Sequence, residues 1–206
     1  MLKGLEGKSI VVTGAGAGIG AATCRRLVAE GARVVAADID TSAAAAIAKE
    51  LGGEAVAVGA DVSTPEGAAA CVSAAVEAFG RVDAFHANAG VEGRAHLVAE
   101  FDVAVYEQVF GVNVRGAFLS AHAALTQLLA QGGGGGIQFT TSLASLMGSP
   151  STASWTHTTD GPDPTPQHAR SHREVLPRRH SCRMGRSRSP GCGKPPRRAT
   201  PGSALS

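Results

Sequence analysis

A glycine-rich segment near the amino end has the residue types and spacing of a loop that holds a diphosphate. It reads Thr-Gly-Ala-Gly-Ala-Gly-Ile-Gly over residues 13–20, between an expected strand and an expected helix. Glycines permit a tight turn and a close backbone approach to phosphate oxygens, and the amides at a helix start favour negative charge. The expected contact positions are Thr13, Gly14, Gly16, Gly18, Ile19 and Gly20. Taken alone, the motif is also compatible with an ordinary glycine-rich turn.

Asp38 favours the ligand-binding interpretation, because it lies 18 residues after Gly20, the last residue of the motif, and ends the second expected strand. A carboxylate there hydrogen-bonds the hydroxyls of an adenosine ribose and repels a 2′-phosphate. No lysine or arginine occurs in residues 9–20 or 34–48 to receive such a phosphate. The sequence therefore predicts NAD rather than NADP, whereas Asp40 is more simply read as a solvated acid.

The pattern of residues 1–150 predicts the elements that position these groups. Short β-branched runs alternate with longer helical patterns, which predicts βαβ units, a parallel sheet and a Rossmann-type, doubly wound α/β fold. The expected strands cover residues 9–13, 33–38, 54–58, 82–87 and 137–141. The expected helices cover residues 19–30, 42–51, 63–79 and 103–131, the last bent near Gly116. Residues 63–66 have the form of a capping box, Ser-Thr-Pro-Glu, at the start of the third helix.

Five motifs in order make this sequence resemble the short-chain dehydrogenase/reductase family over roughly residues 5–155. The first is the glycine motif, and the others are Asp61-Val62, Asn88-Ala89-Gly90, Val112-Asn113-Val114 and Thr141-Ser142. The resemblance implies that Asp61 and Val62 contact the adenine, and that Asn88, Ala89 and Gly90 support the sheet and line the cofactor cleft. It implies that Asn113 lies beside the active site and that Ser142 is the catalytic serine. It also implies the strand order 3-2-1-4-5 and NAD-dependent chemistry on an alcohol or ketone.

The two groups that would move the proton are absent from their expected positions. In the family, a tyrosine downstream of the serine exchanges the hydroxyl proton, and a lysine one helical turn later lowers the pKa of that tyrosine. Here Trp155 and Thr159 stand at these positions. An indole N–H only donates a hydrogen bond, and threonine carries no charge. The sole tyrosine, Tyr106, has no lysine after it in this region, and His157, the nearest other base, is more simply incidental. We therefore expect impaired or absent turnover.

The composition changes abruptly near residue 151. Residues 1–150 contain 9 lysines and arginines against 14 acidic residues, whereas residues 151–206 contain 10 against 3. The second segment also has few large apolar residues, so it cannot bury enough surface to offset the entropy of ordering. We therefore expect an NAD-binding domain over residues 1–150, with its sheet truncated after the fifth strand. We expect residues 151–206 to be a disordered basic tail.

Three hypotheses account for this tail. A reading-frame shift in the coding sequence explains the simultaneous change of composition and periodicity. Alternatively, the chain is a catalytically dead NAD-binding module, or its arginines bind an acidic partner. Nucleic acid is the less favoured partner, because aromatic residues are not interleaved with the arginines. The tail contains histidines and cysteines, the residue types that bind zinc, but their spacing is irregular, and we expect no metal site. These residues are His168, His172, His180, Cys182 and Cys192.

Length and composition exclude several other classes of protein. The chain has 206 residues, of which 44% are hydrophobic, as in a soluble α/β domain rather than a fibre or a disordered chain. Residues 1–8 do not resemble a secretory signal, and no apolar run approaches the roughly 18 residues of a membrane span. Four irregularly spaced cysteines favour a reducing compartment. We therefore expect a cytoplasmic protein that acts on a small alcohol or ketone. We expect no family-type homo-oligomer, because the helices that usually build that interface are missing from the pattern.

Overall fold

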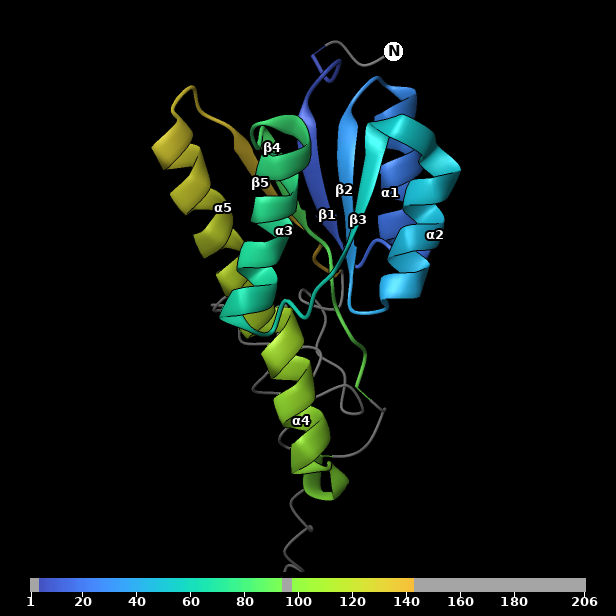
Figure 1. Cartoon of the computed structure of the whole chain (residues 1–206). Coiled ribbons are helices and arrows are strands. Elements are labelled where there is room, and N and C mark those ends of the chain that lie inside the picture. The colour runs from blue at the N-terminus through green and yellow to red at the C-terminus, as the bar shows by residue number, and fades with distance from the viewer. Residues whose placement is uncertain (1–3, 94–97, 143–206) are drawn as a thin grey trace, which may run out of the picture.

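A five-stranded parallel sheet is the centre of the structure, a computed structural model that describes residues 4–93 and 98–142. The strands are β1 (Ser9–Thr13), β2 (Arg33–Asp38), β3 (Ala55–Gly59), β4 (Ala84–Ala87) and β5 (Gly136–Phe139). Their order is β3-β2-β1-β4-β5, and every pairing is parallel (Figure 1). The predicted Rossmann-type fold and strand order are confirmed. The order reverses between β1 and β4, and ligands of such sheets bind at the carboxyl ends of the strands at this point.

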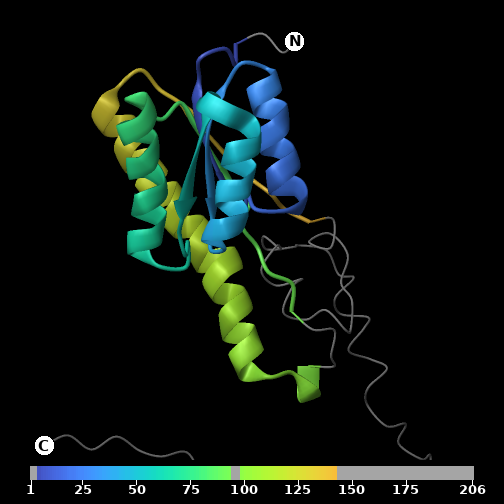
Figure 2. The same cartoon turned by 45° about the vertical axis from the view of Figure 1, so that its right-hand side comes forward.

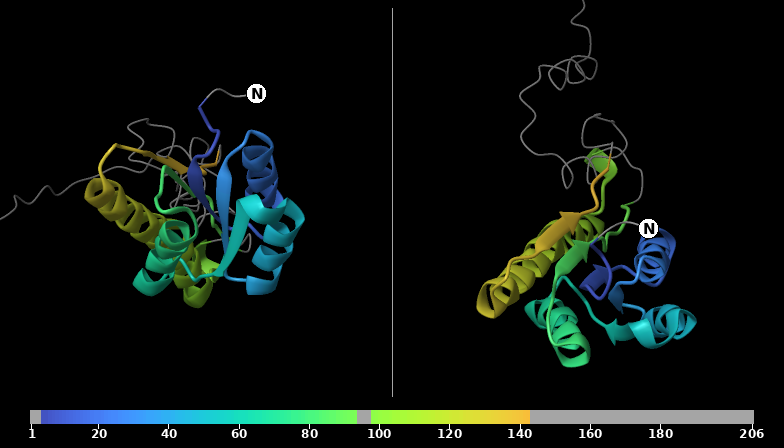
Figure 3. Two further views of the ribbon diagram at one scale, coloured as in Figure 1. Left: turned by 45° about the horizontal axis from the view of Figure 1, so that its top comes forward. Right: turned by 90° about the horizontal axis from the view of Figure 1, so that it is seen from above.

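Helices cover both faces of the sheet (Figure 3). On one face, α1 (Gly18–Ala29) and α2 (Thr41–Leu51) pack against β1, β2 and β3. On the other, α3 (Pro65–Phe79) and α5 (Ala117–Gln131) pack against the sheet and against each other. The helix α4 (Val103–Phe110) extends beyond the carboxyl ends of the strands (Figure 2). Two short 3-10 turns, η1 (Gly52–Glu54) and η2 (Val98–Glu100), precede β3 and α4.

Alternate side chains of the central strands enter two separate cores. Val11 and Val35 pack with Phe85 on the side of α3 and α5. Val12 and Val34 pack on the side of α1 and α2. All five side chains are fully buried. Burial on both faces explains why β1 and β2 are continuous apolar runs rather than alternating ones.

The long helix expected over residues 103–131 is interrupted by a π-helical turn, η3 (Gly111–Gly116). A Cβ at Gly116 would lie 3.1 Å from Cγ2 of Val62, so glycine lets the helix approach the segment after β3 closely. The interruption coincides with the predicted bend, and it contains Asn113. π-helical turns of this kind are frequent at functional sites.

The predicted capping box at the start of α3 is wrong. The N-cap is Thr64, whose hydroxyl oxygen accepts a hydrogen bond from the amide of Gly67 at 3.0 Å. The Ser63 hydroxyl instead donates to the Asp61 carboxylate at 2.7 Å. With Thr64 as the cap, the third helical position is Gly67, so Glu66 cannot close the reciprocal bond.

Three strands differ at their ends from the expected ranges, and β3 lies one residue later than expected, at Ala55–Gly59. β4 begins at Ala84, because the side-chain amide of Gln131 bonds both the N–H and the carbonyl of Val82, where a neighbouring strand would otherwise pair. β5 ends at Phe139 rather than at residue 141, although the amide of Thr140 still donates to Ala87 at 3.1 Å.

No helix in residues 4–93 or 98–142 combines the length and the apolar character needed to cross a bilayer. β5 is an edge of the sheet in this part of the chain. The predicted truncation of the sheet and the predicted disordered tail concern residues 143–206, which lie outside the described residues.

Candidate functional site

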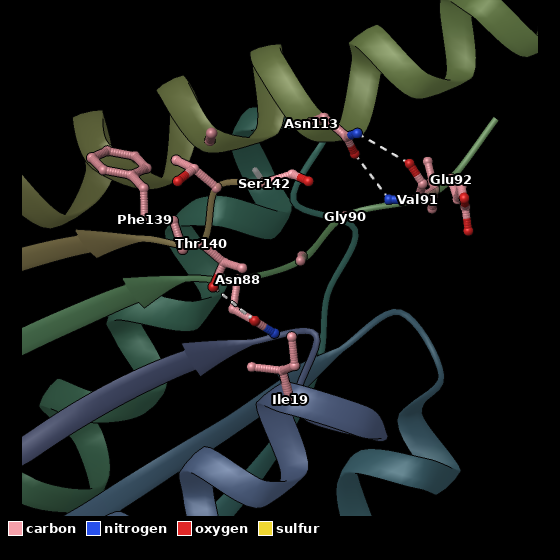
Figure 4. Close-up of a pocket in the computed structure, with 13 residues that line it drawn as sticks. Ile19, Asn88, Gly90, Val91, Glu92, Asn113, Phe139, Thr140 and Ser142 are labelled. Carbon is pink, nitrogen blue, oxygen red and sulfur yellow. Dashed lines mark hydrogen bonds between the residues drawn. The ribbon is translucent and has the colours of Figure 1, made fainter. Parts of the chain in front are cut away.

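A cavity of about 490 Å³ lies at the carboxyl ends of β4 and β5, beside the start of α1 (Figure 4). This volume falls within the usual range for small-molecule and cofactor sites. The lining residues come from four separate segments: Ile19, Ala87, Asn88, Ala89, Gly90, Val91, Glu92, Asn113, Ala117, Phe139, Thr140, Thr141 and Ser142. The fold therefore brings together six predicted site residues that are far apart in the sequence: Ile19, Asn88, Ala89, Gly90, Asn113 and Ser142.

The glycine-rich loop leads into this cavity from the end of β1. A Cβ at Gly20 would overlap the carbonyl oxygen of Gly14, so the loop closes on itself only with glycine at position 20. Gly14 has a φ of +64°, and a Cβ there would lie 2.9 Å from Cα of Ala89. At Gly18, with a φ of +52°, nothing lies within 4 Å of a Cβ, so this part of the loop faces open space. The loop therefore has room for a ligand on the side where Gly18 lies, and protein atoms fill the space beside Gly14 and Gly20.

The start of α1 lacks the side-chain cap that other helices have. Its N-cap is Ala17, which makes no side-chain hydrogen bond, and its first turn has no acidic residue. By contrast, α2, α3 and α4 begin at Asp40, Thr64 and Asp102, whose side chains accept bonds from first-turn amides. Uncapped first-turn amides and the helix dipole together favour an anionic group. The start of α1 therefore fits a diphosphate.

Asp38 ties the end of β2 to the glycine loop. One carboxylate oxygen accepts a bond from the amide of Gly16 at 2.8 Å, and the other accepts from the amide of Asp40 at 2.9 Å. A Cβ at Gly16 would lie 2.9 Å from Asp38 Oδ2 and 2.7 Å from Cβ of Ala43, which explains the glycine there. An ionised carboxylate has about four acceptor positions, so Asp38 can still accept bonds from sugar hydroxyls.

Asp40 has a structural role. Its Oδ1 accepts from the amides of Ser42 and Ala43 at the start of α2. The Ser42 hydroxyl and these amides hold the pKa of the Asp40 carboxyl below its usual value. It is therefore a helix cap rather than the purely solvated acid expected from the sequence.

The hydroxyl of Thr13 joins β1 to the segment after β4. It accepts bonds from the amides of Asn88 and Ala89 at 3.0 and 3.1 Å, and it donates to the carbonyl of His86 at 3.4 Å. The Asn88 side-chain amide returns bonds to the carbonyls of Thr13 and Gly14 at 3.0 and 3.4 Å. These contacts hold the glycine loop against the β4 end of the cavity.

The same network continues to β5 through Thr140. The Thr140 hydroxyl donates to Oδ1 of Asn88 at 2.9 Å, as Figure 4 shows. The Thr140 hydroxyl oxygen also lies 2.9 Å from Nε2 of His86. Because the hydroxyl has one proton and gives it to Asn88, His86 must donate from Nε2. The Nδ1 atom of His86 is then a buried acceptor without a partner in the described structure. Burial lowers the pKa of His86, which keeps the ring neutral.

Asn113 holds the rim of the cavity. Its side-chain oxygen accepts from the Val91 amide at 2.9 Å, and its side-chain nitrogen donates to the Val91 carbonyl at 3.0 Å. The pair fixes the segment after Gly90 against the π-helical turn (Figure 4). Ser142 lines the same cavity from the segment after β5. Asn113 therefore has a structural contact in addition to the role implied by the resemblance.

The predicted pair Asp61-Val62 lies apart from the residues that line the cavity. Asp61 accepts bonds from the amide and hydroxyl of Ser63 at 2.9 and 2.7 Å, which shapes the turn before α3. Val62 is 7% exposed and belongs to the core beside α3 and α5. Both follow β3 at the carboxyl edge of the sheet, the same edge as the cavity.

Thiol and metal chemistry find no support in the described residues. Burial raises the pKa of Cys24 to about 11 and that of Cys71 to about 12, so neither is a thiolate at neutral pH. No group of three or more potential ligand side chains within residues 4–93 and 98–142 is placed to hold a metal ion. Trp155, Thr159 and His157, and the histidines and cysteines of the tail, lie outside the described residues.

Sequence reasoning missed several cavity residues, among them Val91, Glu92, Phe139 and Thr140. The first two directly follow the Asn-Ala-Gly motif, and the last two directly precede Thr141-Ser142. Their adjacency to these motifs was the available signal. No sequence signal indicated the bond between His86 and Thr140, because the two residues are 54 positions apart.

The chain is similar in sequence to known short chain dehydrogenases. The family model described as short chain dehydrogenase matches residues 8–158. An L-rhamnose 1-dehydrogenase (NAD(P)(+)) of Sphingomonas sp. is 40% identical over 151 residues, or 71% of this chain and 59% of that protein. A 2,5-dichloro-2,5-cyclohexadiene-1,4-diol dehydrogenase of Sphingobium indicum is 36% identical over 146 residues, or 71% and 58%.

The fold is also similar to that of a solved reductase structure. A 3-ketoacyl-(acyl-carrier-protein) reductase from Brucella melitensis, complexed with NADH, superimposes with a TM-score of 0.72 at 33% identity. The match covers 75% of this chain and 65% of the reductase. The chain thus spans less than two thirds of the length of each of these three proteins.

The closed glycine loop generates a stability prediction. Gly20→Ala should lower the free energy of unfolding by about 1–3 kcal/mol, because the methyl group overlaps the Gly14 carbonyl and the loop must shift. Gly53→Ala is the matched control, because nothing lies within 4 Å of its Cβ position; it should change stability by less than about 0.5 kcal/mol. Urea denaturation of the three proteins measures both values. Equal stability of Gly20→Ala and the wild type would contradict the described loop.

The buried histidine generates a pH prediction. Because the pKa of His86 is lowered in the folded protein, the unfolded chain binds the proton more readily. Its contribution to stability is present above the ordinary histidine pKa of 6.5 and is lost as the pH falls below it. His86→Gln retains a donor towards Thr140 but does not titrate. The wild type should therefore lose more stability than His86→Gln between pH 7.5 and pH 5. If the free energy of unfolding changes with pH equally in the two proteins, the prediction is wrong. As a control at an exposed position, His122→Gln should show the same change of unfolding free energy with pH as the wild type.

Proposed function

The chain belongs to the short chain dehydrogenase family, and from this premise we propose that its residues 1–150 form a domain that binds NAD. The observation that carries the proposal is the uncapped start of α1, which lies beside Asp38 and opens onto the cavity. The glycine loop also fits the group, because Gly18 faces open space beside the uncapped amides of α1. The similar reductase from Brucella melitensis, which was solved with NADH, supports the same ligand.

In this proposal, each part of the dinucleotide has its own group of residues. Asp38 accepts bonds from the adenosine ribose, and the amides at the start of α1 receive the diphosphate. Asp61 and Val62 lie towards the adenine. The remaining half of the molecule enters the cavity lined by Asn88, Ala89 and Gly90. When bound, the nicotinamide ring supplies or accepts a hydride at a carbon of the substrate.

The same geometry favours NAD over NADP. A 2′-phosphate would meet the negative charge of Asp38, and the space between Asp38, Gly16 and Ala43 is already filled. No lysine or arginine in residues 34–48 offers a counter-charge. The rhamnose dehydrogenase relative is named for both forms of the cofactor, so this preference is a property proposed for the present chain.

We propose a small alcohol or ketone as the substrate of the ancestral reaction, since the relatives are named for a sugar and a cyclic diol. Ser142 would bond the substrate oxygen, and Asn113 would hold the rim that carries Val91. The proton-exchanging tyrosine and its lysine are replaced by Trp155 and Thr159. We therefore propose that this chain binds NAD and oxidises alcohols poorly or not at all.

We propose that the NAD-binding domain of residues 1–150 is followed by a separate segment. Residues 151–206 form a basic segment, and a shifted reading frame or an acidic partner accounts for its composition. Buried, reduced Cys24 and Cys71 fit a cytoplasmic location. We propose no membrane or nucleic-acid partner and no family-type homo-oligomer.

Asp38→Asn should weaken NADH binding by about tenfold, because a bond from a ribose hydroxyl to a charged acceptor is lost. Asp40→Asn is the matched control, since asparagine caps a helix as well as aspartate does, and it should bind NADH like the wild type. Fluorescence titration with NADH measures all three affinities. Unchanged affinity of folded Asp38→Asn would show that the ribose is held elsewhere.

Turnover tests the second half of the proposal. With NAD⁺ and L-rhamnose or a cyclic diol, the chain should be about 10²- to 10⁴-fold slower than the rhamnose dehydrogenase relative, which is the usual contribution of general acid–base catalysis. NADH formation followed by absorbance gives the rate, at protein concentrations where NADH binding has been measured. A rate comparable to that of the relative would show that another group moves the proton.

A further inference from the structure

Glu92 is the only residue with a charged side chain among the described residues that line the cavity. It is exposed, and it directly follows Val91, whose N–H and carbonyl are both held by the side chain of Asn113. The backbone that carries Glu92 is therefore fixed at the rim rather than free to swing away. Figure 4 shows it at the same end of the cavity as Val91 and Asn113.

The two ends of the site would receive different halves of a dinucleotide. Asp38 and the start of α1 suit the adenosine and the diphosphate, as argued above. The nicotinamide half is then left for the cavity that Glu92 lines. The oxidised nicotinamide ring carries a formal positive charge, whereas the reduced ring is neutral. A negative charge at this end therefore acts differently on the two redox states.

We propose that the Glu92 carboxylate shifts the binding preference of this protein towards NAD⁺ and away from NADH. The inference rests on the proposed function. No lysine or arginine among the described lining residues offsets the carboxylate. Because Glu92 is exposed, its attraction for the oxidised ring is partly screened by water, and the effect is about two- to fivefold in relative affinity. Salt should reduce it further.

The test compares NAD⁺ and NADH affinities of the full chain without using turnover. Calorimetry with NAD⁺ and fluorescence with NADH give the ratio of the two dissociation constants for the wild type and for Glu92→Gln. The substitution should weaken NAD⁺ binding by about two- to fivefold and change NADH binding little. Glu92→Asp, which keeps the charge, should stay close to the wild-type ratio.

Glu54→Gln is the matched control, because Glu54 is an exposed carboxylate before β3, at the opposite edge of the sheet. It should leave both affinities unchanged. If folded Glu92→Gln binds both ligands with the wild-type ratio, the inference on Glu92 is overturned while the proposed function stands. If the folded wild type binds neither ligand, the proposed function fails and the inference fails with it.

Discussion

The hydroxyl of Thr13 occupies the point where β1 and β4 separate, and the geometry of the site depends on it. It is buried, and it satisfies two backbone amides beyond the end of β4 while donating to a third backbone group. Buried polar backbone groups without partners are costly. A single side chain therefore stabilises the opening between the two strands at the place where the strand order reverses. The cavity lies at that opening.

The other features of the site follow from the close packing around this point. Gly14 and Gly20 bring the loop near enough for Asn88 to bond its carbonyls, and Asn88 in turn receives the Thr140 hydroxyl. The ends of β1, β4 and β5 are thus connected by one chain of hydrogen bonds that ends at His86. The start of α1 is held by the same loop, with its first-turn amides free of a side-chain cap.

Local patterns were enough to predict the fold, and they singled out six residues that the fold brings together at the cavity. The strands were recognisable because β1 and β2 are buried on both faces and so are apolar throughout. Asp38 and the glycine motif were recognisable because each stands at the end of an expected strand. Contacts between distant side chains could not be predicted in this way. Gln131 bonds Val82, just before the start of β4, from 49 residues away, and Asn113 holds Val91 from 22 residues away. The cap of α3 was misassigned because Ser63 and Thr64 are chemically alike, and only the backbone conformation selects one of them.

Hydrogen exchange of the backbone amides in residues 14–20 shows whether this loop receives the diphosphate of NAD. Exchange is measured on the full chain with and without saturating NADH. We expect NADH to slow exchange in residues 14–20 and to leave η1, at the opposite edge of the sheet, unchanged. Saturable NADH binding without slower exchange in this loop would contradict it.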